Sequence, residues 1–383
     1  MSSCAPCPIC SSPSSRNLYS MEFSEKQYLP QRTVVKLCTA CNFAFSWPRD
    51  AKAYDNFYST NLNDFMGAEL KFSESEIRRY SGQIEALQSV LQQDRALRIL
   101  DIGCGQAGLL RTLKRRYPNN TYYAVDPNVD VRQKSDRGIR FSQTWKDLDQ
   151  KFDLIILSHV VEHVVDFSEF TPLPWLLADR GHVYIEVPDA SQYHNYARQE
   201  YLYYFDRLHI NHFTHDALSA LAMQWGLVVG ARGGSEFEYK DRRPYPAIYI
   251  LATLGGTAAA HAERATPLAQ SLVAYLQSEA ERSQLQRDAL SQAGPLVVYG
   301  FGDNFFKSAG PQGPLSNVDI VAVIDRRHAA LNQSPYASRY KFMDMDACCA
   351  TYPEASYVVA ISWGGEAVQK ELQRLGINNI VLI

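Results

Sequence analysis

The feature that most constrains the fold is a glycine-rich turn in the segment ILDIGCGQAG, residues 99–108. An apolar run typical of a buried strand is followed by three closely spaced glycines, and then by a helical pattern, LLRTLKRRY; the glycines are Gly103, Gly105 and Gly108. Glycine lets the backbone approach a ligand closely, and the helix N-terminus favours a carboxylate or a phosphate. The next strand-like run, YYAVDP, ends in Asp126, which can accept hydrogen bonds from both hydroxyls of a ribose. The segment therefore predicts a strand, turn and helix that bind an adenosine-containing cofactor.

Asp101, directly before the turn, decides which cofactor fits. Glycines at this spacing also match the turns that bind nicotinamide dinucleotides, and a merely packed turn is a further alternative. A carboxylate at this position would repel a pyrophosphate, but it would suit the ammonium group and the sulfonium charge of S-adenosylmethionine. The segment resembles the first motif of class I S-adenosylmethionine-dependent methyltransferases. The resemblance implies that Asp101, the three glycines and Asp126 hold that cofactor.

Two later segments extend this resemblance. SQTWKDL follows the third expected strand, and the resemblance implies that Thr144 or Trp145 flanks the adenine, although core packing explains the tryptophan equally well. FDLIILSHVVEHV contains the fourth strand, and Ser158 and His159 lie at its carboxyl end, where ligands of open α/β sheets bind. Glu162 and His163 follow, and we interpret both as structural rather than catalytic.

Five of the eight cysteines lie close to the N-terminus. Cys7 and Cys10 form one CxxC pair, and Cys38 and Cys41 form a second. Each pair can supply two thiolates from one tight turn, and a tetrahedral zinc ion takes four. We predict a structural zinc site, because four protein ligands leave no open position for chemistry. Cys4 is an alternative to Cys7 in the first pair.

Strand-like and helix-like runs alternate over most of the 383 residues, which is typical of parallel sheets with crossover helices. A polar, helix-prone stretch from Thr257 to about Gln292 interrupts the alternation, which restarts at PLVVYGFGDN. We therefore predict an α/β fold with a zinc-binding module at residues 1–60, a Rossmann-like domain that binds S-adenosylmethionine at residues 61–255, and a connecting helix with a second Rossmann-like domain at residues 256–383. The turn of the last domain could hold a nucleotide diphosphate or serve packing, and its residues are Gly300, Gly302 and Asp325.

Charge and hydropathy narrow the classes of partner. The formal net charge of -3 argues against binding to nucleic acid, which favours a basic excess. No apolar run approaches the ~20 residues that span a membrane, and MSSCAPCPICSS lacks the charged and apolar regions of a signal peptide. We therefore expect a cytoplasmic enzyme that acts on a small molecule, in a compartment that keeps thiols reduced. The sequence leaves the oligomeric state open.

The order of a zinc module, a methyltransferase domain and a second Rossmann-like domain resembles the zinc-containing nucleotide-sugar C-methyltransferases, which act on nucleotide-linked 4-keto-deoxysugars. The resemblance implies that the C-terminal domain helps to hold the nucleotide and that the segment YFDRLHINHFT carries a catalytic base. Aligning Phe213 and Thr214 with the Phe-Ser of the family places His209 on the base histidine. The same alignment places Leu208 where the family has a glutamate, and this departure favours O- or N-methylation as an alternative.

C-methylation beside a ketone needs a base that removes a carbon-bound proton and a group that stabilises the enolate. His209 is the first candidate for the base and His212 the second; for either, packing or capping near the following helix is the alternative. The resemblance implies tyrosines shortly after the zinc module, and Tyr54 and Tyr58 are the nearest. We predict a methyltransferase that C-methylates a small, nucleotide-linked keto sugar. A scaffold that binds the cofactor without turnover is the alternative from another class.

Overall fold

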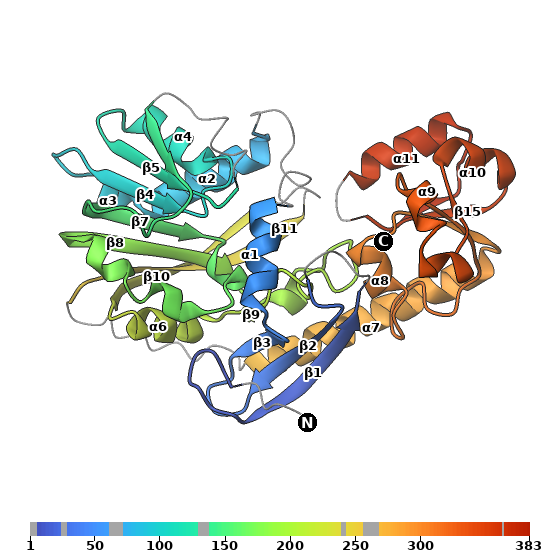
Figure 1. Cartoon of the computed structure of the whole chain (residues 1–383), viewed down its shortest axis with the longest axis horizontal. Coiled ribbons are helices and arrows are strands. Elements are labelled where there is room, and N and C mark those ends of the chain that lie inside the picture. Colours follow the sequence, from blue (N-terminus) through green and yellow to red (C-terminus); the bar gives the residue numbers. More distant parts are fainter. Residues whose placement is uncertain are drawn as a thin grey trace. The chain divides into compact units, whose positions relative to one another are not determined.

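The computed structural model describes residues 6–23, 29–60, 72–128, 138–238, 243–255, 268–361 and 364–383 (Figure 1). The chain divides into two compact units. Unit 1 comprises Met1–Tyr19, Lys26–Tyr196 and Arg207–Leu272, and unit 2 comprises Ser20–Glu25, Ala197–Asp206 and Val273–Ile383. Most of the predicted zinc module therefore lies in the same compact unit as the predicted cofactor-binding domain.

Unit 1 is built on a seven-stranded sheet with the strand order β10-β11-β8-β7-β4-β5-β6. Its five parallel strands are β4 (Arg98–Ile102), β5 (Thr121–Val125), β6 (Ile139–Ser142), β7 (Phe152–Ser158) and β8 (Leu177–Pro188). β10 (Val228–Glu238) and β11 (Pro244–Thr253) run antiparallel at one edge, whereas the sequence pattern predicted parallel strands throughout. The connection between them is far shorter than the dozen or so residues of a parallel crossover, so they pair as a hairpin.

Helices cover both faces of this sheet, and those of unit 1 include α2 (Glu74–Ala86), α3 (Gln88–Leu91), α4 (Gly108–Arg116) and α6 (His215–Gln224). Side chains along β7 alternate between two cores: Leu154 and Ile156 pack with residues of α2, α3 and α4. Ile155 and Leu157 pack with residues of α6 instead. The strands are therefore apolar on both sides, which leaves the carboxyl ends of the strands as the place for a polar site.

The N-terminal segment belongs to a second, four-stranded sheet in the order β1-β2-β3-β9. Its strands are β1 (Ser15–Glu22), β2 (Arg32–Cys38), β3 (Ala44–Trp47) and β9 (Asn211–His212), and α1 (Ala51–Thr60) follows β3. The short β9 comes from far along the chain, with Asn211 opposite Phe45 and His212 opposite Ala44. Cys7, Cys38 and Phe43 share the core that contains the α6 side of the large sheet. The predicted zinc module thus shares a core with the large sheet.

Unit 2 contains a parallel five-stranded sheet in the order β14-β13-β12-β15-β16. Its strands are β12 (Leu296–Tyr299), β13 (Ile320–Ile324), β14 (Phe342–Met343), β15 (Ser356–Val359) and β16 (Ile380–Leu382). The helices here are α7 (Leu268–Gln292), α8 (Asp303–Ser308), α9 (His328–Leu331), α10 (Met345–Thr351) and α11 (Gly365–Arg374). Parallel strands and helices therefore alternate within residues 268–383, although unit 2 also takes in Ser20–Glu25 and Ala197–Asp206, which lie outside the predicted bounds of the last domain.

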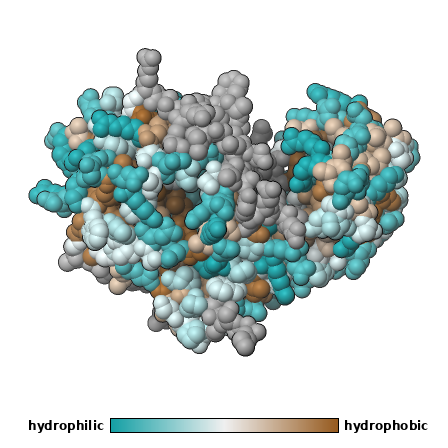
Figure 2. All heavy atoms as spheres, viewed as in Figure 1, coloured by the Kyte–Doolittle hydropathy of each residue, from teal (hydrophilic) through white to brown (hydrophobic). Residues whose placement is uncertain are grey.

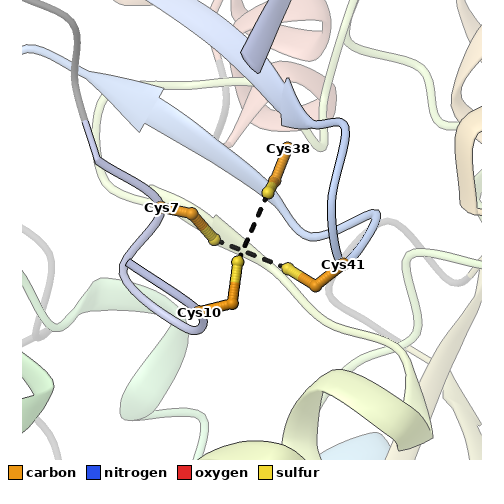
Figure 3. A group of neighbouring side chains, drawn as sticks. All are labelled: Cys7, Cys10, Cys38 and Cys41. Atoms are coloured by element: carbon orange, nitrogen blue, oxygen red, sulfur yellow. Dashed lines mark hydrogen bonds between the residues drawn. The ribbon is translucent and has the colours of Figure 1, made fainter. Parts of the chain in front are cut away.

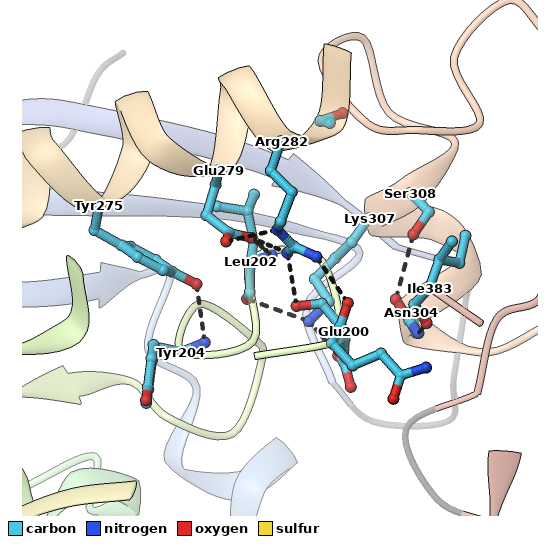
Figure 4. A network of polar contacts seen from close by, with 12 residues as sticks. Glu200, Leu202, Tyr204, Tyr275, Glu279, Arg282, Asn304, Lys307, Ser308 and Ile383 are labelled. Atoms are coloured by element: carbon cyan, nitrogen blue, oxygen red, sulfur yellow. Dashed lines mark hydrogen bonds and ion pairs between the residues drawn. The ribbon is translucent and has the colours of Figure 1, made fainter. Parts of the chain in front are cut away.

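A buried polar network within unit 2 fixes the segment that precedes the predicted base (Figure 4). The backbone N–H of Leu202 donates to Glu279 Oε2 at 2.7 Å, and Glu279 forms an ion pair of 2.6 Å with Arg282. Lys307, whose side chain is fully buried, forms an ion pair with Glu200. Because each buried charge has an opposite partner, α7 and α8 hold residues 197–206 firmly.

Candidate active site

The turn between β4 and α4 is shaped for the close approach of a ligand. Gly103 and Gly105 have positive φ angles of 74° and 50°. A Cβ atom on Gly103 would lie 2.6 Å from Val160 Cγ2, and one on Gly108 would lie 2.3 Å from the hydroxyl oxygen of Tyr80. A side chain at Gly103 or Gly108 would meet a neighbouring side chain, so at these two positions the backbone itself faces its neighbours.

Asp101 and Asp126 lie near the carboxyl ends of the neighbouring strands β4 and β5. Asp126 accepts hydrogen bonds from the backbone N–H groups of Gly105 at 3.0 Å and Asn128 at 2.9 Å. Burial and the nearby charge of Asp126 raise the pKa of Asp101 to about 8. Burial also raises the pKa of Asp126. Two buried carboxyl groups of this kind favour a cationic ligand, which would stabilise their ionised forms.

Ser158 and His159 lie at the end of β7 in a dense polar cluster. The ring nitrogens of His159 are 3.1 Å (Nδ1) from Glu162 Oε1 and 3.2 Å (Nε2) from Glu186 Oε1. The side-chain amide of Gln83 donates to Ser158 Oγ at 2.8 Å and to Glu186 Oε1 at 2.7 Å. Burial opposes protonation of His159, but its contacts with the two carboxylates raise its pKa. Glu186 and Gln83 were not predicted as site residues, because they come from β8 and α2, which are distant along the chain from Ser158 and His159.

A pocket of ≈ 220 Å³ lies beside this cluster. Arg79 and Gln83 of α2 line one side, and Phe237 of β10 lines the other. The guanidinium carbon of Arg79 is 4.7 Å from the centre of the Phe237 ring, and its Nη2 lies 3.3 Å from Ser158 Oγ. The pocket is therefore connected to the carboxyl end of β7 through two hydrogen-bonding side chains.

Trp145 is largely buried, with 8% of its surface exposed. Its ring stacks on Phe170 at a centroid distance of 5.7 Å, and Phe170 in turn packs against Trp225 at 5.3 Å. The tryptophan belongs to the core on the α6 side of the sheet. Of the two alternatives that the sequence left for this residue, this environment supports core packing.

Half-buried catalytic candidates gather beside the turn that follows β7. The His163 ring centroid lies 4.9 Å from that of His209 and 5.9 Å from that of Tyr58. The Nδ1 atom of His163 is 2.9 Å from the carbonyl oxygen of Leu208. Ligand atoms of Glu162, His163 and His209 all lie within 4.8 Å of one another. A buried carboxylate thus stands beside two imidazoles that reach the surface, and two of these three residues had been interpreted as structural.

Tyr54 and His212, the other two catalytic candidates, are fully packed. Tyr54 is 2% exposed, and its hydroxyl donates to the carbonyl oxygen of Arg207 at 2.7 Å. His212 is 0% exposed in β9, with its ring 6.0 Å from the ring of Tyr193. Both environments are typical of residues that position a backbone, since a residue that exchanges protons with a substrate needs access to it.

A buried amide and a buried guanidinium hold the backbone of the active-site turn. The Nδ2 atom of Asn211 donates to the carbonyl oxygens of Val161 at 2.9 Å and Val164 at 2.8 Å, while its Oδ1 accepts from Arg49 at 2.8 Å. Arg49 also donates to the carbonyl oxygens of Val164 and Val165, both at 2.7 Å. Burial lowers the pKa of Arg49 to about 10. The sequence analysis missed both residues, because their partners are distant along the chain.

The four predicted zinc ligands come together with their sulfur atoms facing one another (Figure 3). The Sγ–Sγ distances are 3.6 Å for Cys7 and Cys41 and 3.5 Å for Cys10 and Cys38. Four thiolates around a tetrahedral zinc ion, with Zn–S bonds of about 2.3 Å, would be about 3.8 Å apart. The cluster therefore has dimensions that match a Cys4 zinc site.

The two cysteine turns also share a backbone geometry. Ser11 and Asn42, which directly follow the CxxC pairs, both have a φ of 58°. The N–H of Ser11 donates to the carbonyl of Cys7 at 2.8 Å, and the N–H of Asn42 donates to that of Cys38 at 3.1 Å. The same turn thus occurs twice, and each copy directs both of its thiols inward.

The glycine turn of unit 2 is closed by an ion pair. Gly300 has a φ of 100°, and a Cβ there would lie 2.3 Å from Ile361 Cγ2. Asp325, at the end of β13, accepts from the backbone N–H of Phe301 at 3.1 Å and pairs with Arg327 at 2.9 Å. Contacts with Arg327 overcome the effect of burial and lower the pKa of Asp325. Its carboxylate is therefore already engaged, which supports packing for this turn.

The face drawn in Figure 2 is mostly hydrophilic, with hydrophobic residues grouped between polar ones. Within the described ranges, no helix combines the length and apolar character that crossing a membrane requires.

Residues 72–231 match the family model described as a methyltransferase domain. No curated protein matches the chain. Among solved structures, coclaurine N-methyltransferase, bound to N-methylheliamine and SAH, aligns with a TM-score of 0.36 and 12% identity over 52% of this chain and 78% of its own. A S-adenosylmethionine dependent methyltransferase from Mesorhizobium loti aligns with a TM-score of 0.34 and 17% identity over 45% and 99%. The 1,6-didemethyltoxoflavin-N1-methyltransferase of Burkholderia thailandensis, with bound S-adenosylhomocysteine, aligns with a TM-score of 0.39 and 15% identity. The alignment covers 56% of this chain and 97% of that protein. The residues that match the family model include the glycine turn, the end of β7 and His209.

Proposed function

We propose that this chain, an S-adenosylmethionine-dependent methyltransferase, methylates a carbon atom of a small, nucleotide-linked keto sugar. The observation that carries the proposal is the juxtaposition at the carboxyl edge of the sheet. Val160, in the segment that follows β7, lies against the glycine turn at Gly103. His163 lies three residues further along the same segment, and His209 lies beside His163. The cofactor's methyl group and the proton-accepting side chains would thus meet at one edge of the sheet.

The residues of the turn fit S-adenosylmethionine. Burial and the charge of Asp126 raise the pKa of the Asp101 carboxyl group to about 8, against the opposing effect of Arg79, and the cofactor would bring a further positive charge to it. Asp126 keeps oxygen lone pairs for ribose hydroxyls beside its two backbone donors. When bound, the cofactor supplies an electrophilic methyl group. The chain contributes the orientation of the two reactants, which is the main source of rate in such a displacement.

His209 is our candidate for the base that takes the proton from the carbon beside the ketone. It is half-buried, so it can meet a substrate, and it lies against His163 and the buried carboxylate of Glu162. The glutamate that the family resemblance implies next to the histidine is replaced by Leu208, but Glu162 brings a carboxylate to the same neighbourhood from another segment. Tyr58, on the other side of His163, is the candidate donor to the enolate oxygen.

Methylation of an oxygen or nitrogen atom is the second candidate function, and Leu208 is the observation that favours it. A hydroxyl or amine acceptor also needs a base, but it needs no group to stabilise an enolate. The same histidines could serve both reactions, so the two functions differ in the acceptor atom and not in the fold.

For the metal, we propose one structural zinc ion at Cys7, Cys10, Cys38 and Cys41. The sulfur spacing near 3.6 Å and the repeated turn geometry support it. All four positions of a tetrahedral ion would be filled by protein, so the ion would stabilise the fold and take no part in methyl transfer.

The test is methyl transfer from isotope-labelled S-adenosylmethionine to a panel of nucleotide-linked 4-keto and ordinary sugars, run in deuterated water. We expect label in a keto sugar and solvent deuterium at the carbon beside the ketone. In His209→Gln both should fall together by about 10²-fold or more, the usual contribution of a general base. His182→Gln, a matched change of a histidine in the middle of β8 that pairs with Leu154 of β7, should leave both unchanged. Label only in hydroxyl or amine acceptors, without exchange, would overturn C-methylation.

A further inference from the structure

We propose that Glu162, His163 and His209 bind one divalent transition-metal ion, distinct from the zinc proposed for the cysteines. The binding of this ion does not depend on the proposed function, but its role does, because the ion would act on the acceptor that the proposed function names. One carboxylate and two imidazoles form a donor set suited to Zn²⁺, Fe²⁺, Mn²⁺ or Co²⁺, and three protein ligands leave positions open for substrate oxygen.

The three donor groups are almost at coordinating distance. Their ligand atoms lie within 4.8 Å of one another, and Glu162 Oε1 is 3.9 Å from His163 Nε2. Metal–ligand bonds of about 2.1 Å place neighbouring ligand atoms roughly 3.0–3.4 Å apart. Side-chain rotations that move these atoms by about 1 Å or less would therefore close the set around an ion.

The hydrogen bond of His163 prepares the correct nitrogen for coordination. Its Nδ1 atom is 2.9 Å from the carbonyl oxygen of Leu208, and a carbonyl can only accept a hydrogen bond. Nδ1 must then carry the proton, which leaves the lone pair of the neutral ring on Nε2, the atom that faces Glu162. Metal-binding histidines typically have this arrangement, with the second nitrogen donating to a carbonyl or carboxylate.

The carboxylate is buried and its backbone is held in place. The Glu162 side chain is 1% exposed, and His159 Nδ1 at 3.1 Å supports one of its oxygens. Asn211 and Arg49 fix the surrounding turn through four hydrogen bonds to backbone carbonyls. His163, in contrast, keeps 24% of its side chain exposed. The donor set is therefore preorganised on one side and open on the other, as a site that receives a substrate requires.

An ion at this position would stabilise negative charge on an acceptor oxygen, whether this is an enolate or an alkoxide. A coordinated His209 could not also accept the proton, so in this arrangement it would be a metal ligand instead of the base, and hydroxide bound to the ion would take the proton from the acceptor. Removal of His209 should weaken metal binding as well as turnover, whereas the removal of a histidine that serves only as a base would leave metal binding intact.

The test is a titration of the full-length, zinc-loaded protein with Mn²⁺, followed by electron paramagnetic resonance of the free ion, and repeated with Co²⁺ by absorption. We expect one further ion per chain. Glu162→Gln and His209→Gln should each weaken its binding at least tenfold, and His182→Gln should not change it. Unchanged binding of S-adenosylhomocysteine in the variants will show that they are folded. Binding of neither ion at millimolar concentration, or equal affinity in all variants, overturns the inference.

The two proposals fail in different ways. If the second ion binds but no sugar is methylated, the proposed function is refuted and the metal site stands. If the protein methylates a keto sugar at full rate after the second ion has been removed, the proposed function stands and the metal site has no part in it.

Discussion

The buried carboxyl group of Asp101 should make cofactor binding depend on pH. Its pKa is about 8 in the ligand-free protein, so it is largely protonated at neutral pH. Binding of a cation beside it requires the ionised form, and the free energy needed to ionise it rises by about 1.4 kcal/mol for each pH unit below 8. The dissociation constant for S-adenosylmethionine should therefore fall about tenfold for each unit between pH 5.5 and 7.5. This range lies below the titration of an α-amino group, at about 7.7–8.0.

The assay is isothermal titration calorimetry at several pH values in that range, with wild type and Asp101→Asn. The variant keeps Asp126 and His159, so any contribution from their titration remains in both proteins. We expect weaker binding by the variant and a slope that has lost about one log unit per pH unit. Equal slopes in the two proteins would refute the reasoning, because Asp101 would then not be the group that ionises on binding.

The same shift determines how the ligand-free protein responds to pH. The folded-state pKa of Asp101 is raised from 3.8 to about 8, so the folded state binds a proton that the unfolded state releases between these values. The free energy of unfolding therefore falls as pH rises through this window, and the loss is complete above about pH 8. Asp101→Asn should flatten this part of the profile and raise the melting temperature most at pH 8, as measured by thermal denaturation.

Three further changes test the glycine turn after β4, the cysteine cluster, and the hydrogen bonds of Asn211 to the turn after β7. Gly103→Ala places a Cβ atom 2.6 Å from a valine side chain and forces a residue with a side chain to adopt a φ of 74°, so we expect loss of cofactor binding. Gly82→Ala is the matched control, because its Cβ atom would meet nothing within 4 Å. Equal effects of the two changes on cofactor binding would contradict the steric argument. Cys38→Ser should remove one zinc ion per chain and lower the melting temperature, whereas Cys349→Ala should retain the metal. Elemental analysis measures the zinc content of both variants. Zinc retained in Cys38→Ser would argue against a Cys4 site. Asn211→Ala removes the amide that donates to the carbonyls of Val161 and Val164 and that accepts from Arg49, while Arg49 keeps its own bonds to Val164 and Val165. The change should cost about 1–3 kcal/mol of stability in chemical denaturation and lower kcat, and a loss below about 1 kcal/mol would show that water replaces the amide.

Local sequence patterns were sufficient for the large sheet and the cofactor turn. The strand that ends near Asp101 and the strand that ends in Ser158 are continuous apolar runs, and such runs identify strands that are buried on both faces. Gly103 was recognisable because the demand on its backbone is local. The prediction of parallel strands was wrong for β10 and β11, which pair antiparallel, because apolar alternation does not encode strand direction.

Contacts between segments that are distant along the chain could not be predicted from the sequence. Glu162 follows a predicted strand, and nothing near it in the chain indicates that His209 will stand beside it. Asn211 is an ordinary polar residue in a short segment, yet its amide holds the turn at Val161 and Val164. Trp145 had two equal interpretations, and only the position of Phe170 favours one of them. In each case the deciding partner is set by the tertiary fold and not by the local pattern.

The cysteine cluster and the candidate active site are linked through one short strand. The second cysteine turn leads from β2 into β3, and the N–H of Cys38, the last residue of β2, donates to the carbonyl of Phe43, just before β3, at 2.9 Å. β3 pairs with β9 through Phe45 and Asn211, and Ser46 donates to the carbonyl of Ile210 at 2.9 Å. Ile210 and Asn211 directly follow His209, and Asn211 donates hydrogen bonds to the turn that carries Glu162 and His163. A metal that fixes the start of β3 would therefore limit the motion of the histidine pair without touching it, which gives a physical reason for a structural ion in a chain whose chemistry takes place elsewhere.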